Sequence, residues 1–108
     1  MLPGPLRLPS REFRSGKYRA IPTPYFLLKS KGNQREQNRI GVVAGPAVHK
    51  NATKRNFWKR QAKMTLLTLR STGNDFLVII SPKANTLTKA QFREKLLAAA
   101  ARASGLLT

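Results

Sequence analysis

Residues 53–70 constrain the fold more than any other part of the chain, because they contain neither glycine nor proline and repeat apolar side chains at helical spacing. On a wheel that advances about 100° per residue, one stripe collects Trp58, Ala62, Thr65, Leu66 and Leu69. Asn51 or Thr53 would cap the start, and the Gly73-Asn74-Asp75 sequence would follow the end. The segment is therefore predicted to form a helix with one buried side.

The flank beside this stripe carries positive charge alone. Lysines and arginines recur between residues 50 and 70, where no Asp or Glu occurs. A merely solvated helix face, which is the alternative, usually mixes both signs because oppositely charged neighbours stabilise a helix. We interpret the flank as a surface for nucleic-acid phosphates. The predicted RNA-binding residues are Lys50, Lys54, Arg55, Asn56, Lys59, Arg60 and Lys63.

The remaining patterns predict the element order α-β-β-α-β-α, an α+β fold in which helices form one layer and a small sheet the other. Thr88 and Gln91 have the spacing of a capping box, which marks the start of the last helix. The predicted elements are a short helix at 10–15, strands at 21–29, 40–44 and 76–80, and a last helix that ends near Gly105. The run at 40–44 is apolar throughout, as in a strand buried on both faces.

The charge balance limits the class of protein. Lys and Arg number 21 against four Asp and Glu, for a formal net charge of +17, which repels itself unless a polyanion neutralises it. The chain has no cysteine, no stretch near the roughly 20 apolar residues of a membrane-spanning helix, and no apolar block typical of a secretory signal at its start. We expect one cytoplasmic RNA-binding domain over residues 1–108, with an extended segment at 1–9.

Motifs along nearly the whole chain follow the order of one known family. The central ones are Gly41-Val42-Val43, the basic run Lys50-Asn51-Ala52-Thr53-Lys54-Arg55-Asn56, and Lys59-Arg60-Gln61. Weaker ones are Arg7-Leu8 with Phe13, Pro24-Tyr25-Phe26, the strand at 76–80 and Gly105-Leu106-Leu107. The pattern resembles the protein component of bacterial ribonuclease P.

This resemblance implies a ribosomal S5 domain 2-like sandwich with a small mixed sheet and a left-handed β-α-β crossover, an exception to the usual right-handed rule. It implies that the protein, as a monomer, joins a catalytic RNA through the basic helix and assists removal of the 5′ leader from precursor tRNA. Mg²⁺ is expected with that RNA, and no cofactor on the protein alone. The chain departs from the family at Phe57, where the motif has a second Arg, and at Pro46-Ala47. Phe57 has two open interpretations, packing or base stacking.

A second site is predicted on the sheet. Alternation along 21–29 places Phe26 and Leu28 in the core, and Tyr25 with Lys29 on the other face. The resemblance assigns that face to the single-stranded leader. The predicted leader cleft comprises Phe13, Tyr25, Lys29 and Val43, a surface suited to stacking unpaired bases. The alternative is that Phe13 only anchors its helix and Tyr25 is an ordinary edge residue.

No catalytic or metal-binding residue is predicted on the protein. Hydrolysis of a phosphodiester requires carboxylates that hold metal ions, or a paired acid and base. The acidic residues Glu12, Glu36, Asp75 and Glu94 lie on different predicted elements, and His49 lies in a loop. The chain would thus be an accessory subunit of an endoribonuclease whose chemistry resides on RNA.

Two other classes of protein fit the sequence less well. A basic structural ribosomal protein is the alternative, but the placement of Arg-Asn and Lys-Arg after a Gly-Val strand favours the ribonuclease P family over it. A membrane-surface binder would set bulky apolar side chains beside the cations of its helix, and residues 59–70 do not.

Overall fold

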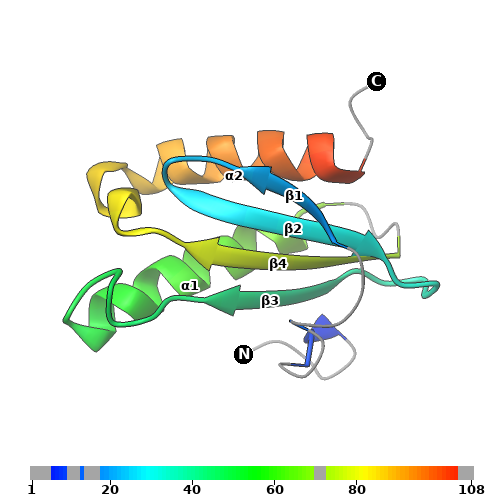
Figure 1. Ribbon diagram of the computed structural model, residues 1–108, viewed down its shortest axis with the longest axis horizontal. Coiled ribbons are helices and arrows are strands. Elements are labelled where there is room, and N and C mark those ends of the chain that lie inside the picture. The colour runs from blue at the N-terminus through cyan, green and yellow to red at the C-terminus, as the bar shows by residue number, and fades with distance from the viewer. Residues whose placement is uncertain (1–5, 10–12, 14–17, 70–72, 105–108) are drawn as a thin grey trace.

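A computed structural model describes residues 6–9, 13, 18–69 and 73–104, and within them two α-helices pack on one face of a four-stranded sheet (Figure 1). The predicted α+β class is confirmed. The elements are β1 (Arg19–Pro22), β2 (Phe26–Gly32), β3 (Arg39–Val43), α1 (Ala52–Leu67), β4 (Asn74–Ile80), the 3₁₀ turn η3 (Pro82–Thr86) and α2 (Lys89–Ser104). The predicted first helix at 10–15 and the helix end at Gly105 lie outside the described residues, apart from Phe13.

The sheet is mixed, with the strand order β1-β2-β4-β3. The pairs β1–β2 and β2–β4 are antiparallel, whereas β3 and β4 run parallel and are joined through α1. In the register, Leu28 lies opposite Val78, which lies opposite Val42 on its other side. The predicted mixed sheet is thus confirmed, and the left hand of the crossover stays a prediction.

The segment predicted as one strand at 21–29 is a hairpin of β1 and β2. A tight turn separates the two strands, because Thr23 Oγ1 accepts hydrogen bonds from the backbone N–H groups of Tyr25 (3.2 Å) and Phe26 (3.0 Å). The Thr23 backbone N–H donates to Phe26 O at 2.9 Å, which closes the turn. β1 is an edge strand, as Pro22 and Pro24 indicate.

The core fills the space between the helices and one face of the sheet. Phe92 of α2 is fully buried, and its ring centroid lies 5.7 Å from that of Phe26 and 5.0 Å from that of Trp58. The predicted stripe of α1 is confirmed, because Trp58, Ala62, Thr65 and Leu66 are all buried, and Leu69 beyond the helix is half-buried. Each large apolar side chain buried here contributes about 1.5–3 kcal/mol, so the stripe fixes how α1 sits on the sheet.

Side-chain caps set the ends of the helices. Asn51 is the N-cap of α1, since its Oδ1 accepts from the Thr53 N–H at 2.8 Å. The helix ends at Leu67, earlier than predicted, where the backbone N–H and the hydroxyl of Thr68 both donate to Thr65 O. The capping box of α2 is confirmed: the Thr88 N–H donates to Gln91 Oε1 (3.0 Å), and the Gln91 N–H donates to Thr88 Oγ1 (3.1 Å).

The face of the sheet away from the helices, which we call the open face, is covered near β3 by the N-terminal segment. Leu8 is 2% exposed, and its N–H donates to Ile40 O at 3.0 Å, beside a parallel bridge between Arg7 and Ile40. Phe13 lies so close to Gly41 that a Cβ there would be 2.6 Å from Phe13 Cε1. The prediction that this strand is buried on both faces therefore holds at Gly41 but not at Val43, which is 36% exposed.

Candidate nucleic-acid interface

Four of the predicted RNA-binding residues share one hollow on the flank of α1. This α1 hollow, of about 300 Å³, is lined by Asn56, Lys59, Arg60 and Lys63. Their spacing of three and four residues places them on one side of a helix. Asn56 and Arg60 are exposed, while Lys59 and Lys63 are half-buried, so the stems of the two lysines are held against the protein.

The α1 hollow is electropositive because its three cations lie on a helix that contains no Asp or Glu. Cations gathered without an acidic partner repel each other, and the repulsion is relieved when phosphates of a polyanion come between them. The fork of Arg60 suits bidentate hydrogen bonds to a phosphate, whereas the lysines act as point charges. The arrangement is thus able to hold the backbone of a nucleic acid without reading its sequence.

Arg55 does not line this hollow. Its Nη1 donates to His49 O at 2.7 Å and to Lys50 O at 3.1 Å, so its guanidinium holds the loop before α1 against the helix. His49 contributes to the same loop, because its Nδ1 accepts from the Asn51 N–H at 2.9 Å. Lys50 is exposed in this loop. These hydrogen bonds give Arg55 a positioning role that the sequence pattern did not indicate.

Lys54 lies in a separate hollow at the N-terminal end of α1, together with Phe57. The Phe57 ring is half-buried, packs against the core, and makes an edge-to-face contact with Trp58 at 5.0 Å. Of the two interpretations left open for Phe57, packing is therefore present in the structure. The seven predicted RNA-binding residues are divided among the α1 hollow, this second hollow and the loop before the helix.

Three of the four predicted cleft residues lie on the open face. Lys29 is opposite Leu77, which is opposite Gly41 in the next strand, and Phe13 covers Gly41. Val43 is in the neighbouring row, opposite Ile79. Lys29 is half-buried and Val43 partly exposed, so this face offers an apolar surface beside the cation of Lys29.

Tyr25 is placed elsewhere, which corrects the grouping of all four residues on one face. Its ring lies 5.2 Å from Lys95 Nζ of α2 and packs against the core on the helix side. The alternation argument assumed that Tyr25 belongs to a strand, but β2 begins at Phe26. The turn made by Thr23 directs Tyr25 toward α2 instead.

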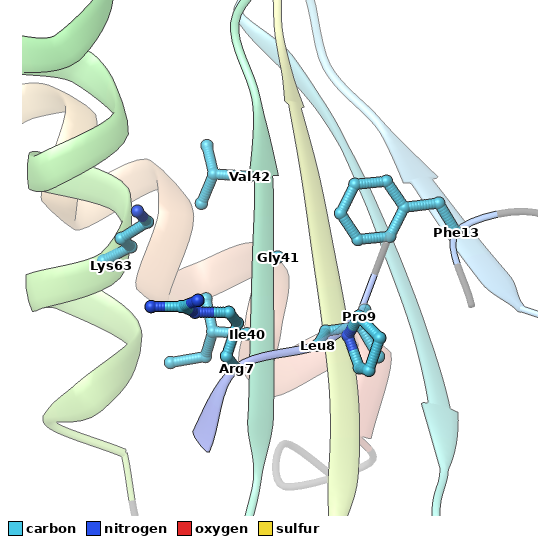
Figure 2. A pocket seen from close by; sticks show the side chains of 8 residues that line it. All are labelled: Arg7, Leu8, Pro9, Phe13, Ile40, Gly41, Val42 and Lys63. Atoms are coloured by element: carbon cyan, nitrogen blue, oxygen red, sulfur yellow. The ribbon is translucent and has the colours of Figure 1, made fainter. Parts of the chain in front are cut away.

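A hollow at the edge of β3 connects the two surfaces. This β3-edge hollow, of about 270 Å³, is lined by Arg7, Leu8, Pro9, Phe13, Ile40, Gly41, Val42 and Lys63. Figure 2 shows Arg7 and Lys63 on the side of β3 that faces α1, and Phe13 on the opposite side. Arg7 was missed by sequence reasoning, because its bridge to Ile40 joins distant parts of the chain and leaves no local pattern.

A buried ion pair organises the other end of the sheet. Arg39 Nε donates to Asp75 Oδ1 (2.8 Å), Arg39 Nη2 donates to Asp75 Oδ2 (2.7 Å), and Asn33 Nδ2 donates to Asp75 Oδ1 (2.8 Å). Burial by itself raises the pKa of Asp75, but the hydrogen bonds from Arg39 and Asn33 and the charges of Arg39 and Lys31 outweigh it and hold the pKa below its ordinary value. The pair is a structural clamp between β3 and β4, and its signal in the sequence is a charge directly before each of two apolar strands.

Two further properties bear on the chemistry of the described part of the chain. Within those residues, no three His, Asp or Glu side chains gather into a group able to hold a metal ion. None of the helices described combines the length and apolar character needed to cross a membrane.

Two comparisons with known proteins, one of sequence and one of fold, agree with each other. A family model described as Ribonuclease P matches residues 10–104. The fold is similar to a mutant RNase P protein of Staphylococcus aureus with defective mRNA degradation activity, at 20% identity over 88% of this chain and 85% of that one, with a TM-score of 0.76. It is also similar to the RNase P protein of Thermotoga maritima, at 25% identity over 85% and 92% of the two chains, with a TM-score of 0.70. No curated protein sequence matches the chain directly.

Proposed function

Because the chain belongs to the bacterial ribonuclease P protein family, we propose that it holds the catalytic RNA on the flank of α1 and the 5′ leader of precursor tRNA on the open face of the sheet. Membership makes it an RNA-binding component of an endoribonuclease that processes tRNA. The proposal concerns how this particular chain carries out that role, and it places the complex in the cytoplasm.

The α1 hollow is the observation that carries the first half of the proposal. Lys59, Arg60 and Lys63 face one space on a helix without acidic residues, and the net charge of +17 favours association with a polyanion. These cations would lower the repulsion between the catalytic RNA and its tRNA substrate. Hydrolysis would use Mg²⁺ ions bound by the RNA, while the protein orients and neutralises.

The side chains of the open face support placing the leader there. Leu27, Ile79 and Val43 form an apolar row there, next to Lys29 and the ring of Phe13. Unpaired bases stack on an aromatic ring whatever their sequence and pack against aliphatic side chains, and a lysine meets the backbone between them. The β3-edge hollow, with Arg7 and Lys63, would let one RNA strand continue from this face toward α1.

Reconstitution tests the proposal. The protein is mixed with a bacterial ribonuclease P RNA and labelled precursor tRNA at low magnesium concentration, where the RNA alone cleaves slowly. We expect the protein to restore 5′ maturation, because it supplies the neutralising charge. An active RNA that gains nothing from the folded protein would overturn the proposal.

The leader assignment is tested with Lys29→Gln, by measuring how tightly the reconstituted complex binds precursor and mature tRNA. Affinity for precursor tRNA is expected to fall several-fold, while affinity for mature tRNA, which has no leader, stays unchanged. Lys83→Gln is the matched control, since Lys83 is an exposed lysine on η3, away from the open face. Equal losses with the two substrates, or no loss, would show that the leader does not lie on this face.

A further inference from the structure

A hollow of about 410 Å³ lies at the N-terminal end of α1, where four parts of the chain meet. We call it the Phe57 hollow. It is lined by His49 of the loop before α1, by Lys54, Phe57 and Trp58 of α1, by Asn85 of η3, and by Leu87 and Lys89 at the start of α2. None of these residues is acidic, and two of them are exposed lysines. Its chemistry is therefore aromatic and cationic.

The aromatic wall of the Phe57 hollow is held rigidly. Trp58 is 4% exposed, and its Nε1–H donates to Asn85 Oδ1 at 2.8 Å. Asn85 is itself fixed, because its Nδ2 donates to Val48 O (2.6 Å) and to Pro82 O (2.9 Å). The Phe57 ring meets Trp58 edge to face, with ring planes at 78°. A ligand would thus meet a preformed wall, with little ordering required on binding.

Three polar side chains around this wall offer hydrogen-bond donors. Lys54 and Lys89 reach the hollow from two different helices. The third is His49, because its Nδ1 accepts the Asn51 N–H and its Nε2–H is the donor of the ring. Packing explains why part of the Phe57 ring is buried. It does not explain why Lys54, Lys89 and His49 lie around the exposed part.

We propose that the Phe57 hollow binds one unpaired nucleotide of RNA, with the base stacked on Phe57 and the phosphates next to Lys54 and Lys89. An aromatic ring accepts the face of any base, and flanking cations neutralise the backbone on either side. The site deepens the proposed function, on which it rests for its natural ligand, by adding an unpaired position to the RNA held along α1.

Trp58 gives a direct measurement, because it is the only tryptophan of the chain and lines the hollow. The full chain is titrated with a single-stranded hexanucleotide of adenosine at low salt, and tryptophan fluorescence is followed. We expect saturable quenching. Phe57→Leu, which keeps an apolar side chain but no ring, is expected to bind about tenfold more weakly, as is usual when one stacking platform is lost.

Two further variants make the result specific to the hollow. Phe57→Tyr retains a ring and is expected to bind as the parent does. If Phe57→Leu does not fold, loss of binding in folded Phe57→Tyr would overturn the proposal. Lys89→Gln should weaken binding several-fold, whereas Arg102→Gln, an exposed cation at the other end of α2, should leave it unchanged. Unchanged affinity of folded Phe57→Leu, or equal losses in Lys89→Gln and Arg102→Gln, would overturn the proposal.

The hollow and the proposed function fail in distinguishable ways. In the first case, the parent protein stimulates a ribonuclease P RNA, and folded Phe57→Leu binds both that RNA and the hexanucleotide as tightly as the parent does. The hollow is then not a nucleotide site, and the proposed function stands. If the hexanucleotide quenches Trp58 in a ring-dependent manner but no stimulation occurs, the nucleotide site stands and its assignment to ribonuclease P RNA falls. Adenosine monophosphate, titrated separately, shows whether one free nucleotide is sufficient for binding.

Discussion

Asp75 shows how much one residue contributes when its charge is buried. Its side chain is fully buried, and Arg39 opposite it is 7% exposed, so neither charge is solvated by water. Removing one partner of a buried ion pair takes away the attraction that offsets the burial of the other charge, which destabilises a protein by about 3–5 kcal/mol. Asp75→Asn is therefore expected to lower the free energy of unfolding by that amount at neutral pH, as measured by urea denaturation.

The same pair predicts a pH dependence. The pKa of Asp75 is lowered in the folded protein, so the ionised form binds its partners more strongly there than in the unfolded chain. The stabilisation is complete above the ordinary carboxyl pKa of about 3.9 and is lost as the pH falls below it toward the folded value. Urea midpoints measured from pH 6 downward should fall in the parent and change less in Asp75→Asn. Parallel curves would contradict this assignment.

Ser30 makes the opposite prediction, because its hydroxyl lies on the core side of β2 without a hydrogen-bond partner among the described residues. A buried polar group without a partner destabilises the folded state, so Ser30→Ala is expected to be neutral or to raise stability by up to about 1 kcal/mol. Thr65→Val is the contrasting control: its hydroxyl is equally buried but donates to Gln61 O at 2.7 Å, so removing it should not stabilise the protein. Thermal unfolding of both variants measures the difference. A clear loss of stability in Ser30→Ala would mean that the hydroxyl has a partner.

At the scale of elements, the turn into β4 depends on Gly73. Its φ is +74°, and a Cβ added there would clash with the backbone oxygen of Arg35. Gly73 O also accepts the Asn33 N–H at 2.8 Å, so the turn holds the loop between β2 and β3 in place. Gly73→Ala is expected to lower the free energy of unfolding by more than about 1 kcal/mol, since it adds backbone strain and forces the two loops apart.

Gly45→Ala is the matched control for Gly73. A Cβ at Gly45 would have no atom within 4 Å, and Gly45 has no positive φ. Its urea midpoint is expected to stay near that of the parent. If the two alanine variants were equally stable, the turn at Gly73 would not be the reason for the glycine.

The elements that the sequence predicted are those whose signal is local and repeated. The stripe from Trp58 to Leu66 recurs every turn of α1, and the spacing of Thr88 and Gln91 is sufficient to mark the start of α2. The hairpin between β1 and β2 depends instead on the hydroxyl of Thr23, and threonine is equally common inside strands. Tyr25 was misplaced for this reason, since strand alternation does not extend through a turn.

Contacts between distant parts of the chain could not be predicted from local sequence patterns. The charges of Arg39 and Asp75 before two apolar strands are visible in the sequence, but their pairing requires β3 and β4 to be adjacent and in register. The bridge between Arg7 and Ile40 likewise joins distant parts of the chain. For the candidate interface, the sequence therefore predicted the cations along α1. It did not predict that Arg55 holds the loop before the helix, or that Lys54 lies with Phe57 in a separate hollow.

At the scale of the whole molecule, the question is whether the charge of +17 acts as a diffuse cloud or through a defined surface. Exposed cations also occur on α2, for example Arg93 and Arg102. A diffuse cloud would make every cation equally important for RNA binding. A defined surface would concentrate the effect in the α1 hollow.

The salt dependence of RNA binding separates these two possibilities. Each phosphate that the protein neutralises releases counterions and adds about 0.7–0.9 to the steepness of log K against log salt. The double variant Lys59→Gln/Lys63→Gln should therefore flatten the slope by about 1.5 when binding to ribonuclease P RNA is measured by filter retention at several KCl concentrations. The control Arg93→Gln/Arg102→Gln removes the same charge from α2 and should leave the slope unchanged, because those cations meet no phosphate. Equal flattening in the two double variants would mean that the net charge, and not the α1 hollow, holds the RNA.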